Sequence, residues 1–527
     1  SGLLRKSAAG TLTLSGTNTF TGGTILAGGT LALGSADALG STGTITLSGG
    51  TLQFSASNTT DYSARFATVD NQAFNFDTNG QDLTLATGLT SSSGGTLAKS
   101  GTGTLTLSGV GNYDGTTTVS AGTLRIADGG SLGTGNIDLP DGTLEFTRPT
   151  ATSLPNQLFV KGTGSSPALL NNGAGLLTIQ PGTSTNIQVD HGETFTVGGS
   201  GDILIEKSIA AGAGASLLTK TGTGTVTLTS PANNWSGGTT IADGVLQVGD
   251  GTSDGTIGSG TITITNGRLA FNRPNPYTIS ETIATFQDGT TPGIENNGAG
   301  LLTVDAANLG FNVGATGITL DLGGTGDGLM DGPIANGGAA ANILKDGIGT
   351  WTFDDANTNY SGTTTVSAGT LEITGRLGQG SYAQTISNEA TLHFNTASAQ
   401  TLSGVISGAG RLQKSNSGTL TLSATNTYSG DTTINAGTLL VSGSGSLGSG
   451  SYAGAITNDG RLEFATSANQ PLSGGLSGSG DLVKGGGNQL TIAGPFSLTG
   501  DISLPDGTLE FARPTATSLP NQLFVKG

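Results

Sequence analysis

Residues 99–107 read Lys-Ser-Gly-Thr-Gly-Thr-Leu-Thr-Leu, and the prediction of the fold starts from this stretch. Leucine and threonine alternate from Thr104 onward, which places Leu105 and Leu107 on the same face of a β-strand. Threonine on the opposite face favours strand geometry and tolerates water. The stretch therefore predicts a short strand with one buried face, preceded by a glycine-containing turn.

The same stretch recurs along the chain. It returns as Lys6–Leu14 and Lys220–Leu228 and, less well preserved, at Lys345, Lys414 and Lys484. Downstream of the first five copies stands an aromatic residue followed two places later by glycine. These aromatic residues are Phe20, Tyr113, Trp235, Tyr360 and Tyr428. Self-similarity of this kind indicates a repeat array.

Longer duplications overlie this unit. The matched stretches are 171–178 with 296–303, 380–383 with 450–453, and 139–162 with 504–527. Their offsets are 125, 70 and 365 residues, and the last pair differs at one position, where Ala512 replaces Thr147. Near-identity over such a length indicates a recent duplication. We therefore expect the parent protein to repeat a block of about this size.

The residues between the strands indicate how the strands connect. Glycine, serine, asparagine and aspartate accept the positive φ of tight corners. Strands of this length with such corners close a coil in roughly 20–25 residues. The sequence therefore predicts an all-β fold, a parallel β-helix (β-solenoid) with the form of an elongated rod.

An array of antiparallel β-sandwich domains is the competing fold. Offsets of 121 and 125 residues between repeats suit modules of that size. Offsets of 69 and 70 residues disfavour it, because whole coils are removed more easily from a solenoid than from a sandwich.

We expect residues 1–527 to form one continuous solenoid segment of a longer chain. The chain opens with Ser1-Gly2-Leu3-Leu4, which is not a signal peptide and already resembles the middle of a repeat. The repeat modules are predicted at approximately 1–97, 98–217, 218–343, 344–411, 412–481 and 482–527.

Composition excludes several classes of function. The net charge of −17 and the pI of about 4.3 disfavour nucleic acid and anionic lipid surfaces as partners. The sequence has no run of 18 apolar residues that would span a membrane as a helix. Cysteine is absent, which suits a chain that is exported unfolded.

The repeat positions predict structural roles. We expect the aromatic residues to fill a coil corner against the next coil, in preference to stacking on sugars. The lysine that opens each repeat is expected at an exposed corner, with its stem covering apolar surface. Asparagines before the aromatic residues are expected to form ladders or to cap turns. These are Asn18, Asn112, Asn234, Asn359 and Asn426.

The sequence shows no pattern typical of a catalytic centre. Glu145 recurs as Glu510, but the residue 125 positions after Glu145 is Ala270. His191 and His393 have no acid or serine at a repeat-related place beside them. We therefore predict no catalytic residue, no cofactor-binding residue and no metal ligand.

Calcium is the one ion that the sequence invites us to consider. Residues 323–329 faintly resemble a calcium-binding nonapeptide, but Gly328 occupies the place where that motif requires aspartate. No cofactor is predicted, and adventitious calcium binding by surface aspartates stays open.

Residues 418–439 carry the clearest family resemblance. They read Gly-Thr-Leu-Thr-Leu-Ser-Ala-Thr-Asn-Thr-Tyr-Ser-Gly-Asp-Thr-Thr-Ile-Asn-Ala-Gly-Thr-Leu and resemble the passenger-associated repeat of bacterial autotransporters. Further copies lie at 10–31, 103–124, 224–246 and 349–371. The resemblance implies a right-handed β-helix passenger, exported from a Gram-negative cell and displayed or released outside it.

Three functions follow as hypotheses. The favoured one is a non-enzymatic extracellular rod that spaces or adheres, with cell-surface or extracellular glycans or proteins, or other copies of itself, as partners. The second is a self-assembling filament, because solenoid ends expose strand edges. The third is a carbohydrate-active enzyme, whose acids would lie in the least repetitive stretch, 55–95. That stretch holds Asp61, Arg65, Asp70, Asp77 and Asp82.

Overall fold

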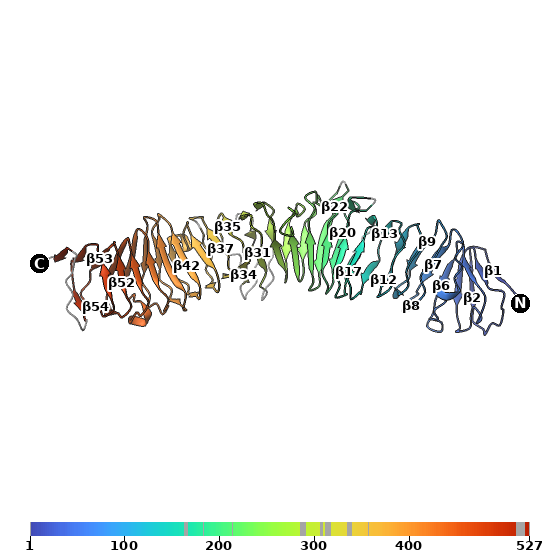
Figure 1. Cartoon of the computed structure of the whole chain (residues 1–527), viewed down its shortest axis with the longest axis horizontal. Coiled ribbons are helices and arrows are strands. Elements are labelled where there is room, and N and C mark those ends of the chain that lie inside the picture. The colour runs from blue at the N-terminus through green and yellow to red at the C-terminus, as the bar shows by residue number, and fades with distance from the viewer. Residues whose placement is uncertain are drawn as a thin grey trace. The chain divides into compact units, whose positions relative to one another are not determined.

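The fold was examined in a computed structural model. It describes residues 2–162, 167–182, 184–212, 214–284, 291–305, 309–310, 318–334, 340–356, 358–512 and 522–525. The chain divides into two units, Ser1–Ile262 and Thr263–Gly527, and each is a succession of short strands joined by turns (Figure 1). The described helices are single 3-10 turns, η1 (Ser63–Arg65), η3 (Gly378–Gly380) and η4 (Gly448–Gly450).

In the first unit, the strands stack into parallel sheets that run across successive coils. One sheet extends from β2 (Thr11–Leu14) to β22 (Ser208–Ala211), and a second runs from β8 (Leu83–Leu85) to β25 (Thr239–Ile241). A third begins at β15 (Thr152–Leu154) and reaches β26 (Val245–Val248). Strands in the interior of each sheet therefore pair with strands from the coils before and after them.

The coils of the first unit gain a third strand at β15. An earlier coil contributes two strands, for example β11 (Thr117–Val119) and β12 (Thr123–Ile126). The coil with β15 contributes three, because β13 (Ile137–Leu139) and β14 (Thr143–Phe146) precede it. The following coil also has three strands, β16 (Leu158–Val160), β17 (Ala168–Asn171) and β18 (Leu177–Ile179). The third sheet thus starts at this step.

The core of the first unit is a set of apolar columns. In β10 (Thr104–Leu107), Leu105 and Leu107 are buried and the threonines are partly exposed. Leu105 lies beside Leu83 of the previous coil and Leu124 of the next. The alternation predicted from residues 99–107 is confirmed, since each coil buries its leucines against equivalent residues above and below.

The second unit repeats this arrangement. Its sheets run from β28 (Arg268–Phe271) to β44 (Ile406–Ser407), from β29 (Tyr277–Ile279) to β55 (Phe496–Leu498), and from β40 (Ser381–Tyr382) to β58 (Leu523–Val525). The register is again parallel, as where Trp351 lies beside Leu371. Its core columns contain buried Trp351, Leu371 and Leu392.

The prediction of an all-β parallel β-solenoid is confirmed, and the antiparallel sandwich alternative is wrong for the described residues. Their named strand pairs are all parallel. Right-handed winding and the six module boundaries stay predictions. No helix in the described part of the chain has the length and hydropathy of a membrane crossing.

Candidate functional site

The repeat lysines lie inside the coils, and the prediction that they occupy exposed corners is wrong. Each follows a buried or half-buried leucine or isoleucine by two positions, so strand alternation turns both side chains inward. The side chains of Lys99, Lys220 and Lys345 are fully buried. Lys6, Lys414 and Lys484 are buried in the same way.

Backbone carbonyls surround each buried ammonium group. In β23 (Leu217–Thr221), Lys220 Nζ donates to the carbonyl oxygens of Thr221 at 3.0 Å and Gly222 at 2.6 Å. It also donates to Asp243 O of the next coil at 3.0 Å. Lys99 makes the same three contacts with Ser100, Gly101 and Ala121. The lysine therefore connects its own turn to the following coil.

Burial sets the protonation behaviour of these lysines. Desolvation lowers the pKa of Lys99, Lys220, Lys345 and Lys414 to about 8. Nearby aspartates oppose the shift in the first three cases, as Asp243 and Asp202 do for Lys220. The lysines therefore remain charged at pH 7, and the carbonyl oxygens stabilise that charge.

The glycine before the closing strand of each repeat lies against the lysine of the preceding coil. Gly244 follows Asp243 and has a φ of +63°, which strains any residue with a side chain. A Cβ there would lie 2.8 Å from Lys220 Nζ and 2.4 Å from Gly222 O. Gly122 has the same environment over Lys99. The glycine before the closing strand thus lets the next coil pass over the ammonium group.

The repeat aromatic residues are partners of a threonine four positions later. Tyr113 OH lies 2.7 Å from Thr117 Oγ1, and Trp235 Nε1 donates to Thr239 Oγ1 at 3.0 Å. The same contact joins Tyr360 to Thr364 and Tyr428 to Thr432. These four aromatic side chains are buried.

Phe20 departs from this arrangement. Its ring is half-buried and has no polar atom. The Thr24 hydroxyl, which holds the place of the threonine partner, is buried without a hydrogen bond. The aromatic site in the first coil is therefore incomplete.

The asparagines fall into two groups. Asn18 and Asn426 stand two places before the aromatic residue, and their side chains donate to the next coil, at Ala38 O and Ser446 O. Asn112, Asn234 and Asn359 stand immediately before it and are exposed.

In the third repeat, Asn233 occupies the bridging place. Its side-chain oxygen accepts from Ile209 N of the coil before, and its nitrogen donates to Thr256 O. Asn234, immediately before Trp235, also bridges coils, because its side-chain oxygen accepts from Ala211 N of the preceding coil at 2.8 Å.

The acids of residues 55–95 cap turns instead of converging on one site. Asp61 accepts from Ser63 N and Ala86 N, Asp77 from Asn79 N, and Asp82 from Thr104 N. Arg65 donates to carbonyl oxygens of the preceding coil, including Gly40 O at 2.8 Å. Within the described residues, no three histidine or acidic side chains lie together as metal ligands would.

His393 has an acid and a serine beside it in space, one on each neighbouring coil, which the repeat pattern of the sequence did not indicate. Its Nδ1 lies 3.2 Å from Glu372 Oε1, and its Nε2 lies 2.9 Å from Ser415 Oγ. Burial lowers the pKa of His393, against the raising effect of Glu372. The three residues lie on β39 (Thr370–Ile373), β42 (Thr391–Asn395) and β45 (Arg411–Ser415), one coil apart. Coil-length spacing was the signal that could have found them.

This order of serine, histidine and acid resembles a hydrolase triad. Acyl transfer also needs donors directed at the developing oxyanion. In the strands that carry Glu372, His393 and Ser415, the backbone N–H and C=O groups pair with the neighbouring strands in a parallel ladder. Asn435 instead donates to Ser415 Oγ at 3.0 Å, extending the hydrogen-bonded row to a further coil. The geometry is that of a polar ladder along the outer face of a sheet.

Glu145 and Glu510 also serve the outer faces of sheets. Glu145 accepts from Arg125 Nε at 2.7 Å and from Asn172 Nδ2 at 2.7 Å, which connects three coils. Glu510 accepts from Gln489 Nε2 at 2.6 Å.

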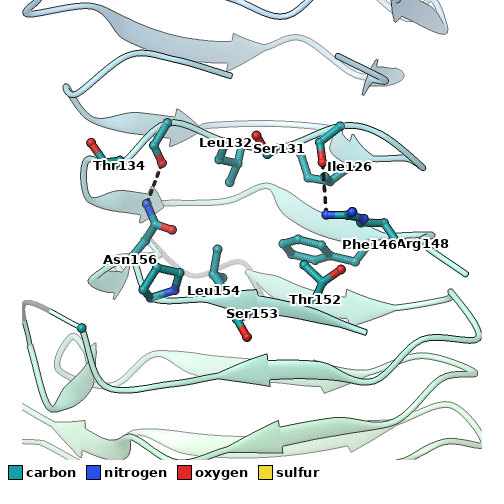
Figure 2. Close-up of a pocket in the computed structure, with 14 residues that line it drawn as sticks. Ile126, Ser131, Leu132, Thr134, Phe146, Arg148, Thr152, Ser153, Leu154 and Asn156 are labelled. Atoms are coloured by element: carbon teal, nitrogen blue, oxygen red, sulfur yellow. Dashed lines mark hydrogen bonds between the residues drawn. The ribbon is translucent and has the colours of Figure 1, made fainter. Parts of the chain in front are cut away.

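A pocket of about 440 Å³ lies beside β15, where the third sheet of the first unit begins (Figure 2). Its apolar wall comes from Ile126, Leu132, Phe146 and Leu154. On one side Arg148 Nη1 donates to Gly130 O at 3.4 Å, and on the other Asn156 Nδ2 donates to Gly133 O at 2.9 Å (Figure 2). The pocket exists because β15 is the first strand of its sheet, so the coil before it offers a loop instead of a strand.

Comparison with known proteins agrees with the repeat pattern. The family model of the Passenger-associated-transport-repeat matches residues 4–33, 97–126, 218–248, 343–373 and 412–441. Each match includes the inward lysine, the aromatic residue and the closing strand. No solved structure matches the chain.

A curated relative is the Adhesin BmaC autotransporter of Brucella suis biovar 1 (strain 1330). It is 29% identical over 506 residues, which cover 75% of this chain and 14% of that protein. The chain therefore spans a small part of the length of this relative. Together, the five passenger-associated transport repeats and this similarity to an autotransporter adhesin support the resemblance to an autotransporter passenger domain.

Proposed function

We propose that this chain is a non-enzymatic structural and adhesive segment of a passenger displayed at, or released from, the surface of a Gram-negative cell. The main support is the use of the recurrent residues. The repeat lysines donate to the next coil, and the glycine before the closing strand lets that coil pass closely over the lysine. The aromatic side chains pack against the next coil, as Trp235 does at Gly258. A repeat built in this way provides length and a regular outer surface, while its similarity to an adhesin favours contact with external partners.

Adhesion is tested with the chain itself. Beads coated with residues 1–527 would be washed over epithelial cell layers and over arrays of extracellular glycans and proteins. We expect more beads to be retained than with heat-denatured chain on the same beads. Equal retention would contradict the adhesive role and leave a spacer role.

Self-assembly into filaments is a second candidate. The near-identical duplication of residues 139–162 at 504–527 and the low share of charged residues, 10%, favour it, because repeated blocks with little surface charge can stack with one another. Light scattering across a dilution series distinguishes it from the first candidate. Growth of long particles with concentration would favour the filament, whereas a constant particle mass would disfavour it.

The Glu372–His393–Ser415 row provides the sharpest test of the non-enzymatic part. A fluorophosphonate probe phosphonylates an activated serine, with fluoride as the leaving group, but does not react with an ordinary serine. We expect no labelling of Ser415 in the folded chain. Labelling that disappears in both His393→Gln and Ser415→Ala would instead show a hydrolytic site.

A further inference from the structure

The chain contains a second version of the pocket region, 125 residues further on. Asn171 and Asn296 each donate through Nδ2 to the residue four places on, Gly175 O and Gly300 O, both at 2.8 Å. Each also donates at 2.7 Å to an aspartate carbonyl of the next coil. The two regions therefore share one local structure, which allows them to be compared residue by residue.

The two versions differ at the first residue of the strand that starts the new sheet. Thr152 opens β15, and its N–H donates to Leu176 O at 2.8 Å. Tyr277 opens β29, and its N–H donates to Leu301 O at 3.0 Å. The backbone is the same, but a hydroxyethyl group stands in one place and a phenol ring in the other.

In the second unit, the phenol ring occupies a defined site. The Tyr277 ring stacks on Phe271, with ring centroids 5.1 Å apart and an interplanar angle of 27°. The guanidinium carbon of Arg273 lies 4.4 Å from the Tyr277 ring centroid. The tyrosine ring therefore contacts a phenyl ring and a cation, both of which favour an aromatic face.

In the first unit, the same walls enclose an open space. Phe146 and Arg148 correspond to Phe271 and Arg273, and both line the 440 Å³ pocket. Thr152 also lines it but is too short to fill it. Arg148 Nε is buried without a hydrogen bond, as expected for a guanidinium group whose flat face is available to contact an aromatic ring. The pocket thus retains the contacts of a ring that this copy does not supply.

The strand beside the pocket favours a polypeptide as the source of the ring. Among the described strands, β15 pairs with β18 on one side and has no strand on the other. Thr152 N–H bonds toward β18, so alternation directs the backbone groups of Ser153 to the other side. An extended segment could pair there while its side chain enters the pocket, a known mode of peptide recognition.

We propose that this pocket binds the aromatic side chain of a tyrosine or phenylalanine in an extended segment of a partner polypeptide. Phe146 and Arg148 hold the ring, and Ser153 offers backbone hydrogen bonds to the flanking residues. This inference names a partner class for the proposed adhesive function but stands on the geometry of the pocket, so it can fail while that function holds.

Methyl NMR of the full chain tests the proposal. The probes are the capped tripeptides Thr-Tyr-Thr and Thr-Leu-Thr, phenol and methyl glucoside, and the signals are the methyl groups of Leu132 and Leu154. We expect the tyrosine peptide to shift both signals and to bind at least about fivefold more tightly than the leucine peptide. Phenol should bind more weakly than the tyrosine peptide, because it lacks the backbone contacts.

The substitution Thr152→Tyr fills the pocket with an aromatic ring of the chain itself. We expect it to abolish peptide binding without lowering the melting temperature. Thr227→Tyr, on the outer face of β24 (Thr225–Leu228), adds the same ring outside the pocket and should leave binding unchanged.

Several outcomes would overturn the proposal. They are undiminished binding to a folded Thr152→Tyr variant, equal affinity for the leucine peptide, phenol binding as tightly as the peptide, displacement of the peptide by methyl glucoside, and no binding at millimolar peptide. The bead assay on the parent chain separates the two ideas. Bead retention by a parent chain that binds no tyrosine peptide removes the pocket proposal alone.

Discussion

Lys220 shows how a charged residue is accommodated between stacked coils. Burying an ammonium group in an apolar environment is costly unless its donors are satisfied. Three carbonyl oxygens from two coils accept its three hydrogen bonds, and Thr221 O also accepts from Gly199 N at 3.2 Å. The lysine is therefore a cap for the turn as well as a core residue.

Replacing this lysine should be strongly destabilising. In Lys220→Met, the carbonyls of Thr221, Gly222 and Asp243 lose their shared donor while remaining in a crowded turn. We expect a loss of about 3 kcal/mol in the free energy of unfolding. Urea unfolding followed by circular dichroism measures it.

Lys161 provides the matched control. It is a partly exposed lysine of the same unit, paired with Asp138 at 2.9 Å and lying over the Phe159 ring. Lys161→Met should cost no more than about 1 kcal/mol. Equal effects of the two substitutions would show that the carbonyl cage is not the source of the stabilisation.

Phe20 offers the opposite experiment, a gain of contact. Phe20→Tyr places a hydroxyl where Tyr113 carries its own, within reach of the unpaired Thr24 hydroxyl. We expect about 1 kcal/mol of added local stability. Hydrogen exchange of residues 20–26 should slow several-fold, whereas Tyr113→Phe should speed exchange of residues 113–119. Unchanged exchange in both variants would contradict the role assigned to the aromatic–threonine pair.

At the scale of elements, strand alternation was predictable and the interior of the turns was not. The period of two places Leu105 and Leu107 inward on any strand, whatever its partners. The same period places Lys99 inward two residues after Leu97, but the usual preference of lysine for solvent pointed the other way. The carbonyl oxygens that reverse this preference come from the turn and the next coil, which sequence alone does not place in space.

The inward lysines make stability depend on pH. Their pKa is about 8 in the folded chain and about 10.4 when unfolded, so between these values the unfolded state binds more protons. Stability should therefore rise as pH increases from 8 toward 10. Urea midpoints at pH 7.5 and 9.5 measure the change.

The buried tyrosines set the upper limit of the pH range over which stability rises. Burial raises the pKa of Tyr452 to about 12 and also raises the pKa of Tyr360 and Tyr428. Above pH 10 the unfolded state releases tyrosine protons that the folded state retains, so stability should fall. In Lys220→Met the rise from pH 7.5 to 9.5 should be smaller than in the parent chain. An identical rise would contradict the assignment.

At the scale of the whole molecule, the duplications act as interchangeable sets of coils. The backbone N–H of Leu377 donates to Gln400 Oε1 at 2.8 Å. In the same way, the backbone N–H of Leu447 donates to Gln470 Oε1 at 2.8 Å. Tyr382 OH and Tyr452 OH both donate to the glycine two places after the preceding aromatic residue, at Gly362 and Gly430. Contacts between neighbouring coils are thus preserved across the 70-residue offset.

Removal of residues 378–447 should therefore leave a folded chain. The deletion joins Leu377 to Gly448, which reproduces the natural sequence Leu447–Gly448 and keeps every strand in register. We expect a parallel-β circular dichroism spectrum and a melting temperature within a few degrees of the parent, because stability in a solenoid depends on near neighbours.

An out-of-register deletion is the control. Removing residues 378–437 joins Leu377 to Thr438, in the middle of a different part of the coil. We expect this variant to lose cooperative unfolding or to aggregate. Equal behaviour of the two deletions would contradict the nearest-neighbour description.

Period-two alternation and repeated motifs predicted the class of fold, the positions of the strands and the family resemblance, because they are local properties of the chain. The tertiary structure decided the inward lysines, the Glu372–His393–Ser415 row and the pocket at β15. Each of these depends on residues one coil apart, and coil length varies: side-chain contacts between successive coils join residues 19 apart in one place and 28 in another. Which residues become neighbours is therefore fixed by stacking, which the local pattern does not specify.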